Sequence, residues 1–163
     1  MRHIPWIAAL AIGAFPLTAR VQQPPQEDPY SKLAFFEGKW TVEGQESTYL
    51  EVCEWFQNRR FLVCKTEDKE GGTSTWGMSI FGYSRETNAY THTLFGSGPV
   101  RTIHGWLGGV TWTFTGEHQA ELDAKRTQIT IKPTKKGFTF RQDVSTNGAA
   151  WKRAADFTYV RLP

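Results

Sequence analysis

Two turns near the C-terminal end constrain the fold of this chain more than any other feature. Asn147-Gly148 is the strongest hairpin signal in the sequence, because both residues tolerate the positive φ angles of a two-residue turn. Placed independently, this turn and one centred on Lys135-Lys136 bring the same side of three segments together. A one-residue slip would expose that whole side, so the agreement predicts an antiparallel sheet with one apolar face. The predicted inner face consists of Thr127, Ile129, Ile131, Phe138, Phe140, Gln142, Val144, Trp151, Arg153, Ala155 and Phe157.

Similar segments recur about ten times between residues 40 and 161, and turn residues separate them. Aromatic residues make up 14% of the chain and there are 15 glycines, a balance that favours strands joined by tight turns. No convincing long helix interrupts them. A sheet of this many sequential hairpins is expected to close on itself rather than leave exposed edges. The sequence therefore predicts an all-β fold, a single antiparallel up-and-down β-barrel of about ten strands.

The N-terminal segment is typical of a signal peptide. A positive start at Met1-Arg2-His3 precedes an apolar run from Ile4 to Phe15, and small residues follow near Ala19. The run is shorter than the roughly 20 residues needed to span a bilayer. We expect cleavage near Ala19, export to the periplasm or outside the cell, and no transmembrane segment in the mature chain. The predicted organisation is a signal peptide over 1–19, a Pro/Gln-rich tether over 20–29 and a barrel over 30–163.

The barrel is expected to begin with a short apolar turn or helix that leads into Gly38-Lys39-Trp40. Glycine permits a sharp entry, and the indole offers a large flat surface that can plug one end of a barrel. The first strand is predicted from Trp40 to about Glu46.

The two cysteines lie in neighbouring predicted strands. A turn at Asn58-Arg59 places Cys53 opposite Cys64. An exported protein can close a disulfide there, although the predicted register makes this a widely spaced, hydrogen-bonded pair that suits a disulfide less well. Both a disulfide and two buried thiols remain open. Two cysteines without an adjacent histidine supply too few ligands for a metal site, so no metal is predicted.

Several motifs in order resemble a bacterial family known as domain of unknown function 1579. They are Glu54-Trp55, Arg60-Phe61-Leu62, the run from Trp76 to Tyr83, the run from Gly109 to Phe114, and Asn147-Gly148 followed by Trp151. The resemblance covers roughly residues 30 to 161 and implies a calycin-like or lipocalin-like barrel, with no catalytic residues to assign. The Gly-x-Trp segment resembles the start of lipocalin barrels. That likeness implies a barrel closure in which Arg161 stacks on Trp40 as a cation–π pair.

Among the polar residues predicted to face the barrel interior, His92 offers the most specific functional hypotheses. A three-residue turn at Gly98 would place it opposite His104, where the two could share a metal. A two-residue Ser97-Gly98 turn instead pairs Tyr90 with Gly105 and extends the apolar face, and we prefer this register. His92 is then either a hydrogen-bonded wall residue or an axial haem ligand, as in nitrobindin-type barrels. No cofactor is predicted.

An enclosed ligand site is expected from the inward-facing residues of the predicted strands. Arg153 and Gln142 stand across from each other on this otherwise apolar face. Arg153 either lies at the barrel rim or anchors the head group of a carboxylated or phosphorylated amphiphile. The predicted ligand-binding residues are Trp76, Met78, Ile80, Tyr90, His92, Trp112, Phe114, Gln142 and Arg153.

Charge and motifs narrow the function classes. A formal charge of +3, without a basic stripe, does not favour nucleic-acid binding. The sequence lacks the common nucleophile, phosphate-loop and zinc-protease motifs, so it favours a binding protein while leaving enzymatic activity open. The leading hypothesis is a barrel that binds a small apolar or amphiphilic molecule. The alternatives are a packed barrel that binds other proteins through exposed Trp106 and Phe81, and a haem-binding or enzymatic barrel.

Overall fold

The computed structural model describes residues 27–69, 73–96, 98–120 and 123–163. Ten antiparallel strands form one closed barrel in the order β1-β10-β9-β8-β7-β6-β5-β4-β3-β2, which confirms the predicted all-β, up-and-down barrel. The strands are β1 Gly38–Val42, β2 Tyr49–Phe56, β3 Phe61–Asp68, β4 Thr75–Ser84, β5 Ala89–Phe95, β6 Arg101–Gly108, β7 Thr111–Ala120, β8 Asp123–Pro133, β9 Gly137–Thr146 and β10 Lys152–Arg161.

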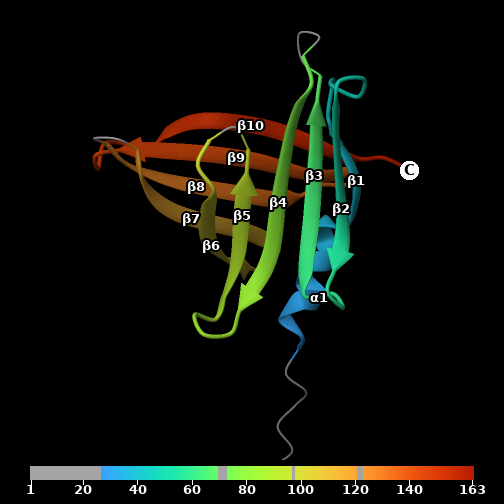
Figure 1. The fold of residues 1–163 in the computed structure, drawn as a ribbon, viewed down its shortest axis with the longest axis horizontal. Coiled ribbons are helices and arrows are strands. Elements are labelled where there is room, and N and C mark those ends of the chain that lie inside the picture. Colours follow the sequence, from blue (N-terminus) through green and yellow to red (C-terminus); the bar gives the residue numbers. More distant parts are fainter. Residues whose placement is uncertain (1–26, 70–72, 97, 121–122) are drawn as a thin grey trace, which may run out of the picture.

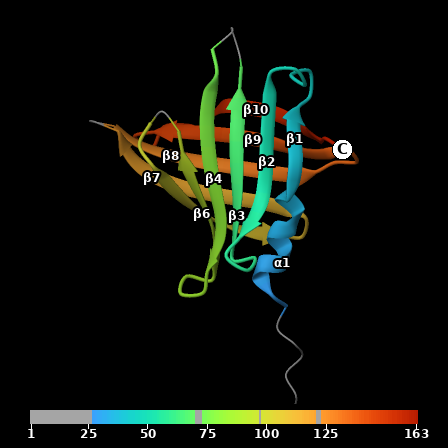
Figure 2. The ribbon, with the colours of Figure 1, turned by 45° about the vertical axis from the view of Figure 1, so that its right-hand side comes forward.

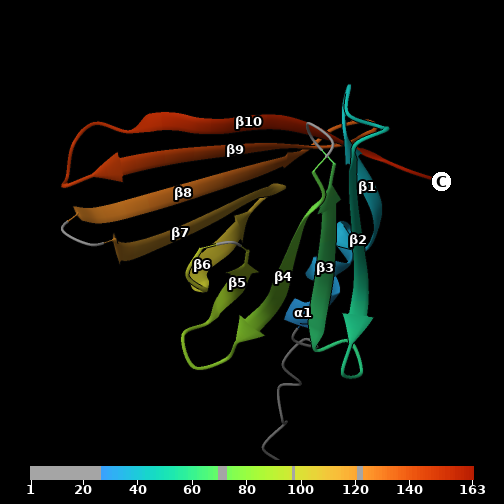
Figure 3. The ribbon, with the colours of Figure 1, turned by 45° about the horizontal axis from the view of Figure 1, so that its top comes forward.

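The barrel is flattened into two curved walls. Strands β2–β4 run across the direction of β7–β10 (Figures 1 and 3), and β5 and β6 join the two walls at one side. Strongly twisted sheets close in this way because each strand is rotated against its neighbour. The two walls therefore enclose a core while the far ends of β7–β10 extend beyond it.

A short helical segment covers one end of the barrel (Figure 2). Helix α1 (Pro29–Leu33) begins at Asp28, whose side chain accepts a hydrogen bond from the Tyr30 backbone N–H, and the 3-10 helix η1 (Ala34–Phe36) follows directly. Leu33 and Phe36 are buried in the barrel core. Proline at the first helical position and an Asp cap explain why a helix forms here despite its short length. The short helix before Gly38-Lys39-Trp40 is as predicted, but Leu33 and Phe36 of this segment plug the barrel end together with the buried Trp40 indole.

The β5–β6 and β8–β9 registers match the sequence prediction. Tyr90 pairs with Gly105 and His92 with Ile103, while Ile129 pairs with Gln142 and Ile131 with Phe140. His104 is exposed and does not face His92. Gly105 is required by close packing, since a Cβ there would lie 2.5 Å from Phe114 Cδ1.

The predicted register of β10 is wrong from the turn onward. Val144 pairs with Lys152 instead of Trp151, so Arg153 lies opposite Asp143 rather than Gln142. A bulge between Arg153 and Ala155 inserts a further residue, so Ala155 and Phe157 return to the predicted inward parity. Trp151 precedes β10 and is 45% exposed, with the Arg126 guanidinium 5.4 Å from its ring centroid.

The predicted inward face of β4 is also wrong. Phe81 pairs with buried Leu62 and is itself buried, so alternation places Trp76, Met78 and Ile80 on the outer face. Trp76 is 68% exposed. Phe81 is therefore not part of the predicted interaction patch, whereas Trp106 is exposed as predicted.

Two smaller differences concern turns and strand ends. Leu107 pairs with Trp112 and Gly108 with Thr111, so the turn consists of Gly109-Val110 rather than Gly108-Gly109. Strand β1 ends at Val42, earlier than the predicted Glu46. In the described part of the chain, no helix has the length and apolar character to cross a membrane.

Candidate functional site

A cavity of about 450 Å³ opens at the end of the barrel opposite α1. Phe36 of the helical plug also lines this cavity. The plug therefore forms the inner end of the cavity, away from its mouth. Its apolar walls come from Phe36, Phe81, Leu94, Ile131, Phe138 and Phe140, and its polar surface from Tyr49, Glu51, Thr66, Asp68, Ser79, His92 and Tyr159. This combination of enclosed volume, apolar walls and a few polar groups is typical of small-molecule sites.

Two residues with small side chains on β4 leave room for this cavity. Gly77 and Ser79 line it, and they share the inner face with Phe81 because side chains alternate along a strand. Phe81 belongs to the aromatic core below, where its ring stacks on Phe36 with centroids 4.6 Å apart. The strand thus contributes a bulky residue near the plug and small ones near the mouth.

His92 is the most unusual side chain of the cavity. It is 4% exposed, and neither ring nitrogen has a hydrogen-bond partner. Its ring stacks on Phe81 with centroids 4.0 Å apart, and its edge meets Phe114. Burial lowers the pKa of His92 to about 3, because a charged imidazolium would be poorly solvated there. The neutral ring therefore keeps one donor and one acceptor nitrogen unused.

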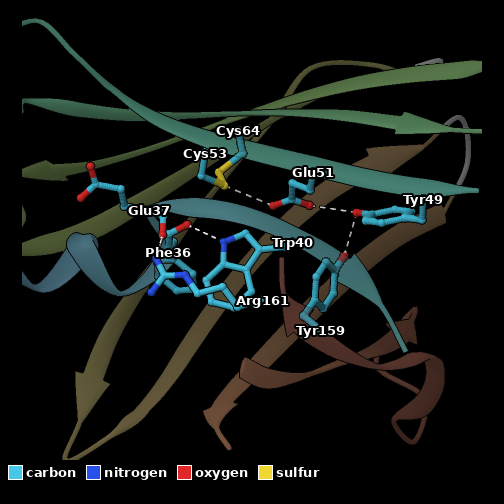
Figure 4. The surroundings of a disulfide bond; sticks show 9 residues. All are labelled: Phe36, Glu37, Trp40, Tyr49, Glu51, Cys53, Cys64, Tyr159 and Arg161. Carbon is cyan, nitrogen blue, oxygen red and sulfur yellow. Dashed lines mark hydrogen bonds between the residues drawn. A yellow bond between two sulfur atoms is a disulfide. The ribbon is translucent and has the colours of Figure 1, made fainter. Parts of the chain in front are cut away.

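A hydrogen-bonded chain of three side chains forms the opposite polar wall (Figure 4). The Tyr49 hydroxyl donates to Glu51 Oε2 at 2.9 Å and lies 2.9 Å from the Tyr159 hydroxyl. Burial raises the pKa of the Glu51 carboxyl and of both phenols. The chain links β2 to β10 across the end of the short strand β1. It therefore closes the barrel wall and lines the cavity with a carboxyl group and two phenol hydroxyls.

Cys53 and Cys64 are joined by a disulfide beside this chain (Figure 4). The residues pair directly across β2 and β3, as the sequence predicted, but their Cα atoms are 3.9 Å apart. This is closer than the widely spaced pair we expected. Glu51 Oε1 lies 3.4 Å from Cys53 Sγ, and a disulfide sulfur carries no proton. Any hydrogen between these atoms belongs to the Glu51 carboxyl.

A second cavity of about 460 Å³ adjoins the first and shares Leu94, Phe95, Gly96 and Phe140 with it. Gln142 and Thr127 line this second cavity. The Thr127 hydroxyl is buried without a hydrogen-bond partner. Both cavities thus contain buried polar atoms that no protein group satisfies.

Apart from Arg153, the predicted ligand-binding residues separate into three groups. His92 lines the first cavity and Gln142 the second. Tyr90, Trp112 and Phe114 are buried in the aromatic core near the plug and line neither cavity. Trp76 and Met78 touch the first cavity from the outer face of β4, and Ile80 touches neither.

Arg153 is not a polar anchor inside the barrel. Its side chain is 56% exposed and forms an ion pair with Asp156 at 2.9 Å. Among the described residues, none that lines the first cavity is an arginine or lysine. Of the two alternatives for Arg153, the exposed position at the barrel surface is the one found, and Arg153 lines neither cavity.

Tyr49, Glu51 and Tyr159 are the site residues that sequence reasoning missed. The signal was present, because Tyr49 and Glu51 share the inward parity of Cys53 in the same strand. A carboxylate on the inner face of a barrel strand is costly unless it is protonated or paired. An inward-facing Glu51 therefore indicates a site where the surrounding residues must supply hydrogen-bond partners to a carboxyl group.

The barrel closure contains the Trp40–Arg161 contact. The two residues pair between β1 and β10, and the Arg161 guanidinium lies 5.0 Å from the Trp40 ring centroid. The Trp40 indole N–H donates to the Phe36 carbonyl at 2.8 Å, and Arg161 donates to the Glu37 carbonyl. These contacts fasten the plug to the seam of the barrel. Compared with known proteins, the chain matches no family model and no curated protein sequence.

Proposed function

We propose that this protein binds a small, largely apolar molecule with at least one polar group inside the open end of its barrel. The observation that carries the proposal concerns unsatisfied polar atoms. Among the described residues, the buried side-chain nitrogens and oxygens without a hydrogen-bond partner belong to His92 and Thr127. Each of these residues lines one of the two adjoining cavities.

Leaving such groups unpaired costs free energy. A buried polar atom without a partner costs about 1–3 kcal/mol, and buried polar groups in folded proteins are nearly always satisfied. A ligand that hydrogen-bonds His92 would recover this cost, whereas a purely structural histidine at this place would find a partner within the protein. The aromatic walls supply apolar contact area for the rest of the ligand.

A fluorescent probe tests whether the cavity accepts such molecules. N-phenyl-1-naphthylamine is an uncharged aromatic compound whose emission rises in apolar surroundings, and we expect saturable binding to the wild-type protein. Ser79→Trp places an indole in the cavity, because Ser79 lines it. This variant should bind the probe at least tenfold more weakly than the wild type. Ile80→Trp is the matched control, since Ile80 is next in sequence but outside the cavity.

The result is decided by comparing the two variants. Loss of probe binding in Ser79→Trp together with retained binding in Ile80→Trp supports an interior site. Equal binding by both folded variants would place the probe on the outside and overturn the proposal. Circular dichroism establishes that each variant keeps its β structure.

A further inference from the structure

The charge of the cavity lining carries the proposed function one step further, to the class of ligand. Glu51 and Asp68 line the first cavity, and no lysine or arginine in the described part of the chain does so. An anionic head group would therefore lose its hydration without gaining a counter-charge, which is costly. The lining is matched instead to a molecule that brings positive charge.

We propose that the cavity binds an amphiphilic amine, whose ammonium group is held by Glu51 while its apolar part lies against the aromatic walls. This inference rests on the proposed function. His92 provides a second, independent indication of a ligand, because it is buried, unpartnered and lines the same cavity. The acceptor nitrogen of its neutral ring suits an N–H or O–H donor of the ligand.

The aromatic side chains around Glu51 favour a cation. Tyr49 and Tyr159 meet edge to face with ring centroids 5.8 Å apart, and Phe138 stacks on Tyr159 at 4.6 Å. Ring faces attract ammonium groups, most strongly where water is excluded. The cavity thus combines a carboxyl with aromatic surface in the way that amine recognition requires.

Binding of an amine at Glu51 has a proton signature. Burial raises the pKa of the Glu51 carboxyl, and an ammonium ion that pairs with Glu51 lowers that pKa again, because the ion pair needs the carboxylate. Amine binding therefore shifts Glu51 towards its ionised form and releases protons from it to solvent, while the ammonium keeps its own proton. A neutral alcohol of the same length displaces none.

Other titratable groups face Glu51, and their contributions to proton release must be distinguished from that of Glu51. They are Tyr49 on its own strand, Asp68 on β3 and Tyr159 on β10, with His92 lining the same cavity from β5. The inner face of β1 contributes Trp40 and Val42, which do not titrate. The pKa of His92 is about 3 and both phenol pKa values are raised, so these three stay neutral between pH 6 and 8. Asp68 is tested by Asp68→Asn.

Three eight-carbon probes that differ in their head group measure the preference of the cavity for an amine. Isothermal titration calorimetry with n-octylamine, 1-octanol and octanoate at pH 7 should rank the amine at least tenfold tighter than the alcohol, with octanoate weakest. Repeating the amine titration in phosphate and in Tris, which differ in ionisation enthalpy, should report net proton release to the buffer. Amine affinity should rise with pH wherever protons are released on binding.

Glu51→Gln should abolish proton release and remove the preference for octylamine over octanol. Glu54→Gln is the matched control, because Glu54 is exposed on the same strand. Equal binding of amine and alcohol without proton release would overturn the amine proposal and leave the interior site standing. Failure of octylamine, octanol and N-phenyl-1-naphthylamine alike would overturn both. Because proton release is measured on the wild-type protein, a misfolded Glu51→Gln variant would not prevent a decision.

Discussion

His92 lies between Phe81 and Phe114 at the inner edge of the cavity, and its two ring nitrogens meet no protein partner. Its position follows from local sequence, because the register that pairs Tyr90 with Gly105 also turns His92 inward. Phe81 is its direct cross-strand neighbour in the β4–β5 hairpin. Phe114 lies on β7, two strands away in the sheet, so its contact with His92 does not follow from local pairing.

The buried His92 should make stability depend on pH. Its pKa is about 3 in the folded protein against 6.5 ordinarily, so below pH 6.5 the unfolded chain binds a proton that the folded chain does not. Stability is therefore lost as pH falls from about 6.5 towards 3. Relative to His92→Phe, the wild-type free energy of unfolding should fall by about 2 kcal/mol between pH 7 and 5.

Urea denaturation at both pH values measures this difference. Phe keeps an aromatic ring against Phe81, and the other titrating groups of the protein cancel between the two proteins. Parallel pH profiles for wild type and His92→Phe would show that His92 is protonated in the folded state or open to water.

At the scale of strands, the sequence predicts best where one face is continuously apolar. The β8–β9 register is of this kind, since Ile129, Ile131 and Phe140 all face inward. Prediction fails at β4, where the cavity needs Gly77 and Ser79 inside and larger apolar residues therefore lie outside. It also fails at β10, where the pairing shifts by one residue at the turn before Lys152 and again at a bulge between Arg153 and Ala155, and no residue type marks such a shift uniquely. The error on β4 thus coincides with the cavity.

The β2–β3 hairpin should owe much of its stability to the disulfide. Cys53 and Cys64 are 11 positions apart, and closing a loop of this size removes conformational entropy from the unfolded chain worth about 3 kcal/mol. Cys53→Ala with Cys64→Ala should lower the free energy of unfolding by about this amount. The double variant should then be insensitive to tris(carboxyethyl)phosphine, whereas the wild type should weaken in it. If the free energy of unfolding fell by less than about 0.5 kcal/mol, the disulfide would contribute little to stability beyond the packing of the two strands.

Across the whole molecule, closure depends on the narrow seam between β1 and β10. The seam has three paired positions, and Arg161 adds its contacts with Trp40 and the Glu37 carbonyl. Gly38 permits this arrangement, since a Cβ there would lie 2.7 Å from the Arg161 guanidinium. The seam and the helical plug are therefore one unit.

Removing the guanidinium should weaken the whole barrel. Arg161→Met loses a cation–π contact and a hydrogen bond to a backbone carbonyl, which together are worth about 1–2 kcal/mol. Arg153→Met on the same strand removes an exposed ion pair and should cost no more than about 0.5 kcal/mol. Thermal unfolding of the two variants compares these effects. Equal losses would contradict a special role for the seam.

The contact between Arg161 and Glu37 joins positions 124 apart in the chain. Hairpins β2–β3 through β9–β10 can each form from neighbouring residues, but the ring is completed only after residues 152–161 have left the ribosome. Until then, the sheet has an exposed apolar face and two unpaired edge strands, which can pair with other copies of the chain. Such long-range closure slows folding, so the interval before the ring closes is when this protein is most prone to aggregate.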